Sequence, residues 1–358
     1  MLKTTKNPIV FILQNLATTI TFVHLKLYVY TDLAQTNYEI IYLEAIPDAA
    51  NKVVFYLQEY LEKRLSYDIP NWNGTAIQNC NNICKPYKIE YAFQNATTNY
   101  ADLTFVDAGF IDYALLAGFE KDDFPLKNTS ELPNDSIFLT TMPYMILDSS
   151  QKAFLYVMPL VTLGNDLIEF KVIYEDNTNH VQTITQNITQ YQAFIIPIGF
   201  EARNYQAANP AKNIKQIDIS IAGQTFSIET VSSHYLNFTQ EIHWANSLGG
   251  FDSLVCTGTA TQTVEASKDL FEHYKPYNYT NDFREIATYN HSKKITGKIR
   301  SGFLPKAVLD KIANDLLTSP LVFLRKDTKF LPINITSKAI QILQSDEFKY
   351  AFEISYEQ

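Results

Sequence analysis

The sequence predicts a mainly β protein with minor α content: several β-sandwich domains, followed by a carboxy-terminal domain in which one helix flanks a β-sandwich. Nearly every recognisable segment alternates apolar with polar residues, which is the period of a half-buried strand. The chain holds 23 Tyr and 23 Phe against 11 Gly, a balance typical of β-sheets. Only one segment, near residues 305–317, has a clear helical period.

Length and composition predict two or three domains, because 358 residues with 46% hydrophobic content bury a sizeable core. A boundary is expected at the polar run Asp148-Ser149-Ser150, and a second near Tyr235. The expected domains are therefore a β-rich domain at 1–150, a β-sandwich at 151–234 and an α+β domain at 235–358.

In the first region, alternation predicts strands at 9–13, 21–30, 38–45 and 87–93. Two further segments of this region are less regular. Residues 51–65 fit a helix through Val54, Leu57 and Leu61, but 53–57 also suit a strand, and both alternatives stay open. The nearly continuous apolar run 105–119 favours a buried turn or short helix.

The second region consists of short strands at regular spacing. The turn residues 175–179 connect two of these strands into a hairpin. Such spacing over roughly eighty residues predicts a β-sandwich of immunoglobulin or fibronectin size. The expected strands are 153–157, 168–174, 181–185, 193–197, 214–221 and 225–230.

In the third region, a strand containing Trp244 turns through Gly249-Gly250 into a second strand. The glycine pair lacks the spacing of a phosphate-binding loop, so a hairpin is the preferred interpretation. A strand is expected at 294–300, and a helix begins at Pro305. A hairpin is then expected over 321–336, and strict alternation at 348–356 predicts a paired carboxy-terminal strand.

Charge and hydropathy argue against two classes of partner. The net charge of −9 and pI near 5.2 disfavour a nucleic-acid-binding surface, since phosphate neutralisation needs clustered Lys and Arg. No apolar run approaches the length of a membrane span. The amino-terminal apolar run is too short for a secretory signal, so we expect a soluble protein kept intact from its first residues.

The titratable residues predict no catalytic or metal centre and no cofactor. Cys80, Cys84 and Cys256 are too few for a disulfide framework, and reduced thiols are preferred to a metal-binding pair; a Cys80–Cys84 disulfide stays open. None of the six histidines lies in a catalytic or metal-binding motif. Acids such as Asp107 and Asp112 leave glycoside hydrolysis as an alternative, but we expect a protein without enzymatic activity.

Several short motifs resemble the tail structural proteins encoded by phages and prophages of Bacteroidetes bacteria. The run 244–252, WANSLGGFD, is similar to their W-x-N-x-L-G-G-x-D segment. The run from Gly297 through Ser319-Pro320 to Ile335 is similar to their carboxy-terminal ending, and 7–11 and 138–143 also match the group. The candidate motif or subunit-interface residues are Trp244, Asn246, Leu248, Gly249, Gly250, Phe251, Asp252, Ser319 and Pro320.

This resemblance implies a distal tail, baseplate-hub or tail-tip protein. Its partners would be copies of itself in a ring, expected to be a hexamer, together with other tail and baseplate proteins. It would be made in the cytoplasm of the host bacterium and carried in the virion tail. The resemblance also implies that region 235–358 is a tail-tube or hub-like domain.

The alternative function is a carbohydrate-binding or other adhesion module. Aromatic-rich β-sandwiches often bind sugars by stacking Trp or Tyr faces, and Trp72 lies in the loop 70–74. The simpler interpretation is that Trp72 packs over a core edge. A glycoside hydrolase ranks behind both alternatives.

Overall fold

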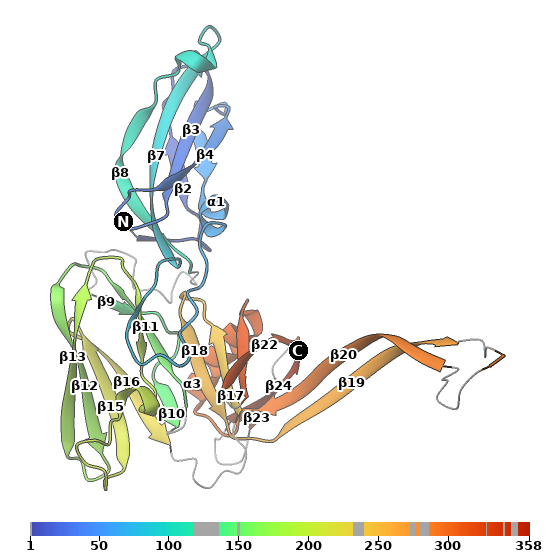
Figure 1. The fold of residues 1–358 in the computed structure, drawn as a ribbon. Helices are drawn as coiled ribbons and strands as arrows, with labels where there is room; N and C mark the ends of the chain where they lie inside the picture. The colour runs from blue at the N-terminus through green and yellow to red at the C-terminus, as the bar shows by residue number, and fades with distance from the viewer. Residues whose placement is uncertain are drawn as a thin grey trace. The chain divides into compact units, whose positions relative to one another are not determined.

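The computed structural model describes residues 2–117, 136–148, 151–231, 240–272, 277–278, 286–326, 328–338, 341–344 and 350–358. The predicted mainly β class is confirmed, since strands far outnumber helices (Figure 1). The chain forms two compact units: unit 1 is Met1–Ser232 with Ala245–Ser253, and unit 2 is Ser233–Trp244 with Leu254–Gln358.

The first part of unit 1 is a five-stranded sheet of order β1-β8-β7-β3-β4, accompanied by the two-stranded ribbon β2-β5. Leu25 and Leu27 of β3 lie in one buried cluster with Phe55 of β5 and Leu61 of α1. Burial of these large apolar side chains drives the association of ribbon, helix and sheet. The bounds are β1 Leu2–Thr4, β2 Val10–Leu13, β3 Ile20–Tyr30, β4 Tyr38–Ala45, β5 Val53–Tyr56, α1 Gln58–Glu62, β7 Cys84–Asn95 and β8 Val106–Leu115.

Two ambiguous segments of this part are now settled. The strand and helix alternatives at 51–65 are both present, as β5 followed by α1. The expected turn or short helix at 105–119 is wrong where the structure describes it, because 106–115 forms β8. This run pairs with β7 on one side and with β1 on the other, so long-range backbone hydrogen bonds override the ambiguous apolar pattern.

The second part of unit 1 contains two sheets, of order β10-β16-β15-β12-β13 and β6-β14-β11-β9. Both contribute to one hydrophobic cluster, which includes Phe170 of β12 and Phe194 of β14. The predicted hairpin is confirmed as the antiparallel pair β12–β13. The bounds are β6 Gln78–Asn79, β9 Ser136–Phe138, β10 Met145–Asp148, β11 Phe154–Pro159, β12 Gly164–Tyr174, β13 Asn179–Ile188, β14 Phe194–Pro197, α2 Phe200–Arg203, β15 Ile214–Ile221 and β16 Gln224–Val231.

Strands on both sides of Asp148 share these sheets. β10 pairs in parallel with β16, β9 pairs with β11, and β6 pairs with β14. Short segments from early in the chain therefore complete sheets whose other strands come later.

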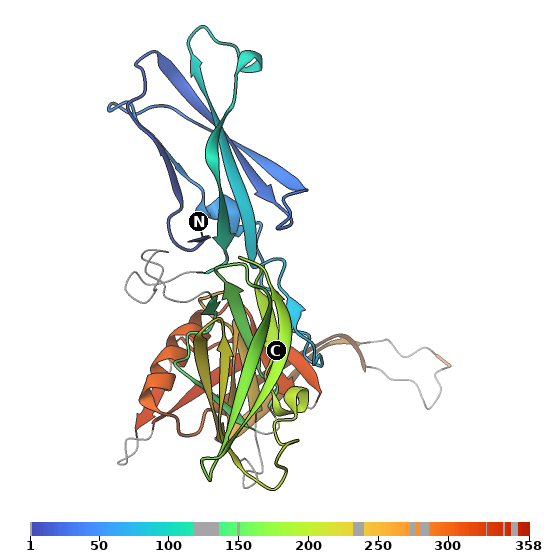
Figure 2. The ribbon, with the colours of Figure 1, turned by 90° about the vertical axis from the view of Figure 1, so that its left-hand side faces the viewer.

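Unit 2 is built on a sheet of order β18-β17-β21-β22-β24-β20-β19, with β23 also pairing to β24. The predicted helix is confirmed as α3, which lies against this sheet and contacts β24 (Figure 2). Val308, Leu309 and Ile312 are fully buried on its inner face. The predicted hairpin is confirmed as β21–β22. The bounds are β17 Gln240–Ala245, β18 Phe251–Cys256, β19 Ala260–Glu272, β20 Ile286–Arg300, α3 Lys306–Thr318, β21 Val322–Lys326, β22 Lys329–Ile335, β23 Gln341–Gln344 and β24 Tyr350–Glu357.

β19 and β20 form a long two-stranded arm, which we call the β19–β20 arm. The two strands pair from Ala260↔Ile299 to Glu272↔Ile286, with one register shift between Lys268 and Asp269. β24 pairs with β20 only over Thr296–Arg300, so the outer part of the arm has no third strand from it. The sequence predicted only the 294–300 part of β20 and missed β19.

Candidate functional site

The side chain of Asn246 organises the turn between β17 and β18. Its Oδ1 accepts hydrogen bonds from the backbone N–H groups of Leu248 and Gly250, both at 3.0 Å. Its Nδ2 donates to the carbonyl of Leu139 at 2.9 Å and to Asp252 Oδ2 at 3.0 Å. Asn246 is 1% exposed, so its amide satisfies buried groups that water does not reach.

Asp252 extends this network to a segment far earlier in the chain. Its carboxylate accepts hydrogen bonds from the hydroxyls of Thr140, at 2.5 Å, and Thr141, at 3.3 Å. Asp252 is fully buried, and a buried carboxylate is tolerated only when hydrogen bonds compensate its lost hydration. The network therefore joins two of the runs, 138–143 and 244–252, that carry the resemblance to tail proteins.

The two glycines of the turn are required by close backbone approach. A Cβ on Gly249 would lie 2.6 Å from the carbonyl oxygen of Leu116, and the φ of Gly249 is +92°. A Cβ on Gly250 would overlap the carbonyl oxygen of Leu139 and press on Tyr156. Only glycine fits either position.

The remaining motif residues occupy different environments. Phe251 is buried and packs on Tyr67, Trp72 and Tyr156, with ring centroids 6.0–6.3 Å apart. Leu248 is half-buried. Trp244, in unit 2, is 1% exposed, and its indole N–H has no hydrogen-bond partner among the described residues.

Ser319 and Pro320 follow the end of α3 in unit 2. The Ser319 hydroxyl donates to the carbonyl of Leu321 at 2.8 Å, which shapes the exit from the helix. Taken together, Trp244, Asn246, Gly249, Gly250, Phe251 and Asp252 are buried inside the chain. We therefore assign this run a structural role, in which buried side chains such as Asn246 and Asp252 hold distant segments of the chain together.

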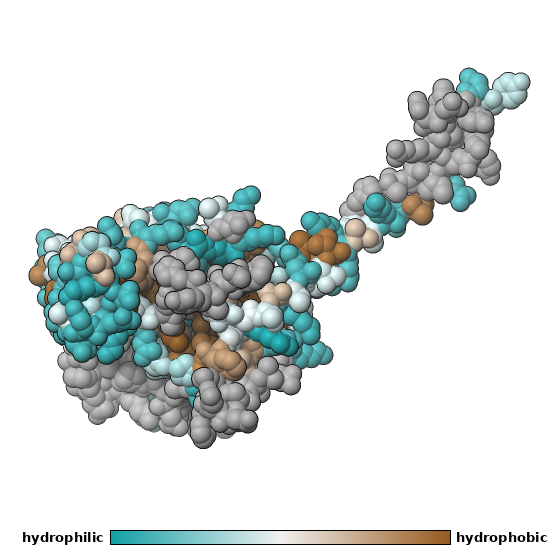
Figure 3. Space-filling model, turned by 90° about the horizontal axis from the view of Figure 1, so that it is seen from below, coloured by the Kyte–Doolittle hydropathy of each residue, from teal (hydrophilic) through white to brown (hydrophobic). Residues whose placement is uncertain are grey.

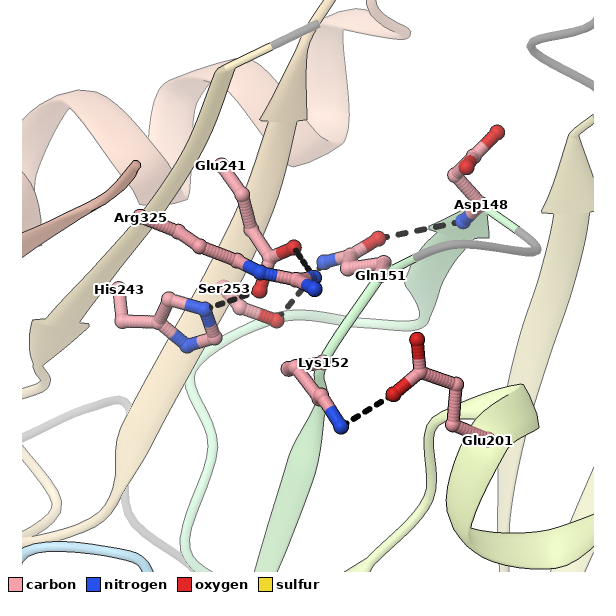
Figure 4. A network of polar contacts seen from close by, with 8 residues as sticks. All are labelled: Asp148, Gln151, Lys152, Glu201, Glu241, His243, Ser253 and Arg325. Carbon is pink, nitrogen blue, oxygen red and sulfur yellow. Dashed lines mark hydrogen bonds and ion pairs between the residues drawn. The ribbon is translucent and has the colours of Figure 1, made fainter. Parts of the chain in front are cut away.

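Trp72 lines a hollow on unit 1. The hollow has a volume of about 210 Å³, and its wall includes Asn73, Phe154 and Gly199. At its edge the ammonium of Lys152 pairs with the carboxylate of Glu201 (Figure 4). Trp72 meets Phe154 edge-on at 5.5 Å, so it both packs over the core and faces the hollow.

The loop that carries Trp72 is held at both ends. The buried Tyr156 hydroxyl donates to the carbonyl of Asp68 at 2.6 Å. The Asp68 carboxylate accepts from the backbone N–H groups of Asn82, at 2.8 Å, and Ile83, at 3.0 Å. The Gln78 side chain accepts from the N–H of Asn71 at 2.9 Å. These bonds give the loop a defined conformation.

Unit 2 contains a cluster of polar side chains around the buried Glu241, on β17 (Figure 4). Glu241 Oε1 lies 2.5 Å from His243 Nε2, and Glu241 Oε2 accepts from Arg325 Nη1 at 2.8 Å. His243 also meets Phe330 edge-on at 5.1 Å. Because Arg325 stands opposite Glu241 in the β17–β21 register, the cluster compensates a buried carboxylate across neighbouring strands.

The cysteines are free and buried, which confirms the prediction of reduced thiols. The Cys80–Cys84 disulfide, left open by the sequence, is not formed. Burial raises the pKa of Cys256 to about 12, and it also raises the pKa values of Cys80 and Cys84. Among the described residues, no group of three or more His, Cys, Asp or Glu is arranged to hold a metal ion.

The β19–β20 arm has two chemically different faces. Residues opposite each other in an antiparallel pair project to the same face, so Val264 shares a face with Ile295, its direct partner, and with the buried Ile299. On this face Val264 is 57% exposed, and Leu270, six residues further along β19, is 62% exposed. Apolar residues therefore continue from the inner face of the sheet onto the uncovered arm, where the exposed Lys268 and Lys293 lie on the same face.

The opposite face of the arm is polar near its root. Lys294 Nζ lies 2.8 Å from Glu357, and Glu353 pairs with both Lys298, at 3.0 Å, and Arg300, at 2.6 Å. Towards the tip, Phe271 is exposed on this face. In the space-filling view the arm extends beyond the sheet of unit 2, with hydrophobic residues among hydrophilic ones (Figure 3).

No protein-family model matches this chain, and no curated protein matches it. In the described part of the chain, no helix has the length and apolar character needed to cross a membrane.

Proposed function

We propose that this protein is a non-enzymatic structural subunit of a phage tail, of the distal tail, baseplate-hub or tail-tip type, and that it assembles with copies of itself into a ring. The observation that carries the proposal is the uncovered β19–β20 arm, which exposes the apolar residues Val264 and Leu270 on one face. The short motifs shared with tail proteins of Bacteroidetes phages and prophages indicate the biological setting.

The arm is poorly suited to an isolated monomer. A two-stranded ribbon is marginally stable in water, and exposed apolar strands invite pairing with other chains. Every described side chain of β19 is exposed. A covering surface would remove Val264, Ile295 and Leu270 from water, at about 25 cal/mol for each Å² of apolar area.

We favour a second copy of the chain as the partner that covers the arm. The arm lies at one edge of the unit 2 sheet, so an arm that packs on a different surface of the next copy makes a head-to-tail contact. Such contacts close into rings when the rotation between copies permits it. We propose six copies, with unit 2 as a tube or hub-like layer.

Two other features support a tail scaffold. The two sheets that share the cluster of Phe170 and Phe194 support the proposal that this part is a β-sandwich, a common scaffold in which function depends on surfaces and loops. The network of Asn246 and Asp252 gives the shared motif a structural purpose. In this proposal the protein is made in the host cytoplasm and joins other tail and baseplate proteins in the virion.

Native mass spectrometry and sedimentation velocity test the proposal on the full chain. We expect a closed oligomer for the wild type and monomers for the double variant Val264→Glu/Leu270→Glu, because buried charges would oppose docking of the apolar face. The matched control is Thr263→Glu/Ser267→Glu, which adds the same charges to the opposite face of the arm and should still assemble. A wild-type protein that stays monomeric at high concentration would refute the proposal.

A further inference from the structure

We infer that the hollow around Trp72 is a binding site for a neutral sugar residue, such as a hexose or N-acetylhexosamine unit of a glycan. The site lies on unit 1 and uses no residue of the β19–β20 arm. It therefore goes beyond the proposed assembly function, and either one can fail without the other.

The aromatic ring of Trp72 forms one wall of the hollow. Sugars present flat C–H faces that stack on tryptophan, whose large ring is apolar with one polar edge. Trp72 is half-buried, and its ring is held edge-on by Phe154 at 5.5 Å and by Phe251 at 6.3 Å. A ring fixed in this way loses little freedom when a ligand stacks on it.

The ion pair of Lys152 and Glu201 lies in the same hollow. Lys152 donates and Glu201 accepts, and hydroxyl groups of a sugar do both. The ion pair leaves the hollow without net charge, so an ionic ligand would have to displace one partner from the other. A neutral ligand rich in hydroxyls has no such competition, and the exposed Asn73 at the rim adds an amide.

The hollow is small, and hydrogen bonds hold the loop that forms part of its wall. A volume of about 210 Å³ is below the roughly 300–1,000 Å³ of sites for drug-sized ligands, and it suits a single sugar ring. The bonds of Asp68 to Asn82 and Ile83 hold the loop before any ligand arrives. Gly199 is required in the wall, because a Cβ there would lie 2.6 Å from the carbonyl oxygen of Gln151.

Tryptophan fluorescence tests this site directly. The chain has only two tryptophans, and Trp244 is 1% exposed, so a ligand-induced change reports on Trp72. The probes are the methyl glycosides of glucose, galactose and N-acetylglucosamine, titrated to about 50 mM, a concentration that nearly saturates a site with a dissociation constant of about 1 mM. Free glutamate and free lysine serve as charged comparison ligands.

We expect saturable fluorescence changes with at least one neutral glycoside and none with the charged ligands. Glu201→Gln should weaken binding about tenfold, because it replaces a charged hydrogen-bond acceptor while keeping its shape. The matched control Glu44→Gln changes an exposed carboxylate outside the hollow and should bind like the wild type. Trp72→Phe, followed by ligand-detected NMR, should also weaken binding while keeping an aromatic ring against Phe154.

Three results would overturn the inference. One is the absence of a response to every neutral glycoside. Another is a response confined to glutamate or lysine, which would indicate an ionic ligand. The third is unchanged affinity in both Glu201→Gln and Trp72→Phe, which would place the sugar elsewhere.

Discussion

At the scale of single residues, the buried side chain of Asn246 is the centre of a hydrogen-bond network in unit 1. Its one amide satisfies two backbone donors, one backbone acceptor and one carboxylate. Because all of these groups are shielded from water, each broken bond leaves a group that nothing else solvates.

Replacing this amide tests that interpretation. Asn246→Ala should lower the free energy of unfolding by about 3 kcal/mol, since several buried polar groups lose their partners. Urea denaturation measures the change. The control Asn187→Ala, on the exposed side of β13, should stay within about 0.5 kcal/mol of the wild type. Equal effects of the two substitutions would contradict the structural role of Asn246.

The glycine pair permits a test that separates close approach from backbone conformation. Gly250→Ala should cost more than about 3 kcal/mol, because its Cβ would overlap the Leu139 carbonyl. Gly164→Ala should cost about 1–2 kcal/mol, because Gly164 has a φ of +69° but open space around it. Thermal or urea unfolding of both variants measures the two losses of stability. A larger loss for Gly164→Ala than for Gly250→Ala would show that packing at the turn is loose.

The buried thiol of Cys256 should make the free energy of unfolding fall as the pH becomes alkaline. In the unfolded chain a thiol titrates near a pKa of about 8.5, whereas burial raises the pKa of Cys256 to about 12 in the fold. The folded state therefore keeps a proton that the unfolded state loses, and stability falls as pH rises above about 8.5, by up to about 1.4 kcal/mol for each pH unit.

Urea denaturation between pH 8 and pH 10.5 measures this slope. Cys256→Ala should show a shallower decline than the wild type, whatever its stability at pH 7, because it removes one titrating group. The buried thiols should also resist a thiol reagent at pH 8 until the protein is unfolded. Identical slopes for the two proteins would show that Cys256 does not titrate in this way.

At the scale of elements, the β19–β20 arm is notable because every described side chain of β19 is exposed. Its root is held by β24 and by the ion pairs of Glu353. The side chains of β19 bury little within the chain, so the arm should contribute little to the stability of unit 2.

Shortening the arm tests this separation of stability from assembly. Replacing residues 267–292 by an Asn-Gly turn, which leaves Ala266 opposite Lys293, should change the free energy of unfolding by less than about 1 kcal/mol. The same protein should be monomeric in sedimentation velocity. A large loss of stability would show that the arm supports the fold itself.

At the scale of the whole molecule, charge opposes self-association. Each copy carries a formal net charge of −9, so copies repel one another at low ionic strength. Added salt shortens the screening length from about 30 Å at 0.01 M to about 8 Å at 0.15 M. An apolar contact remains under these conditions, whereas the repulsion is screened.

The oligomer fraction should therefore rise with salt. Sedimentation velocity from about 0.01 M to 0.15 M sodium chloride provides the measurement. The arm variant Val264→Glu/Leu270→Glu should stay monomeric throughout. Dissociation of the wild-type oligomer on adding salt would indicate a contact made by ion pairs and would exclude the apolar arm as its basis.

Elements with a strong local period were predictable from the sequence. The alternation over 214–221 and 168–174 and the helical spacing of Val308, Ile312 and Leu316 each require burial of one face, whatever the neighbours are. The run 106–115 was mispredicted, and β19 was missed. The apolar pattern of the first fits several structures, and the β-favouring residues Thr261, Thr263 and Val264 of the second were a usable but weak signal.

The candidate site was predictable only in part. Residue type and spacing identified Trp72 and the motif residues as candidates, but no local pattern identified the residues that they contact. Thr140 and Asp252 are 112 positions apart, and Lys152 and Glu201 meet only because β11 and α2 lie close to each other in one unit.

By itself, the sequence determined the mainly β class, most strands and the long helix at 306–318, because these depend on periods that repeat within a few residues. Only the tertiary structure decided which polar side chains meet, which glycines face a neighbouring backbone and which strands remain uncovered. The physical reason is that hydrogen bonding and burial depend on distances in space, and segments far apart in the chain set those distances only after the sheets have packed.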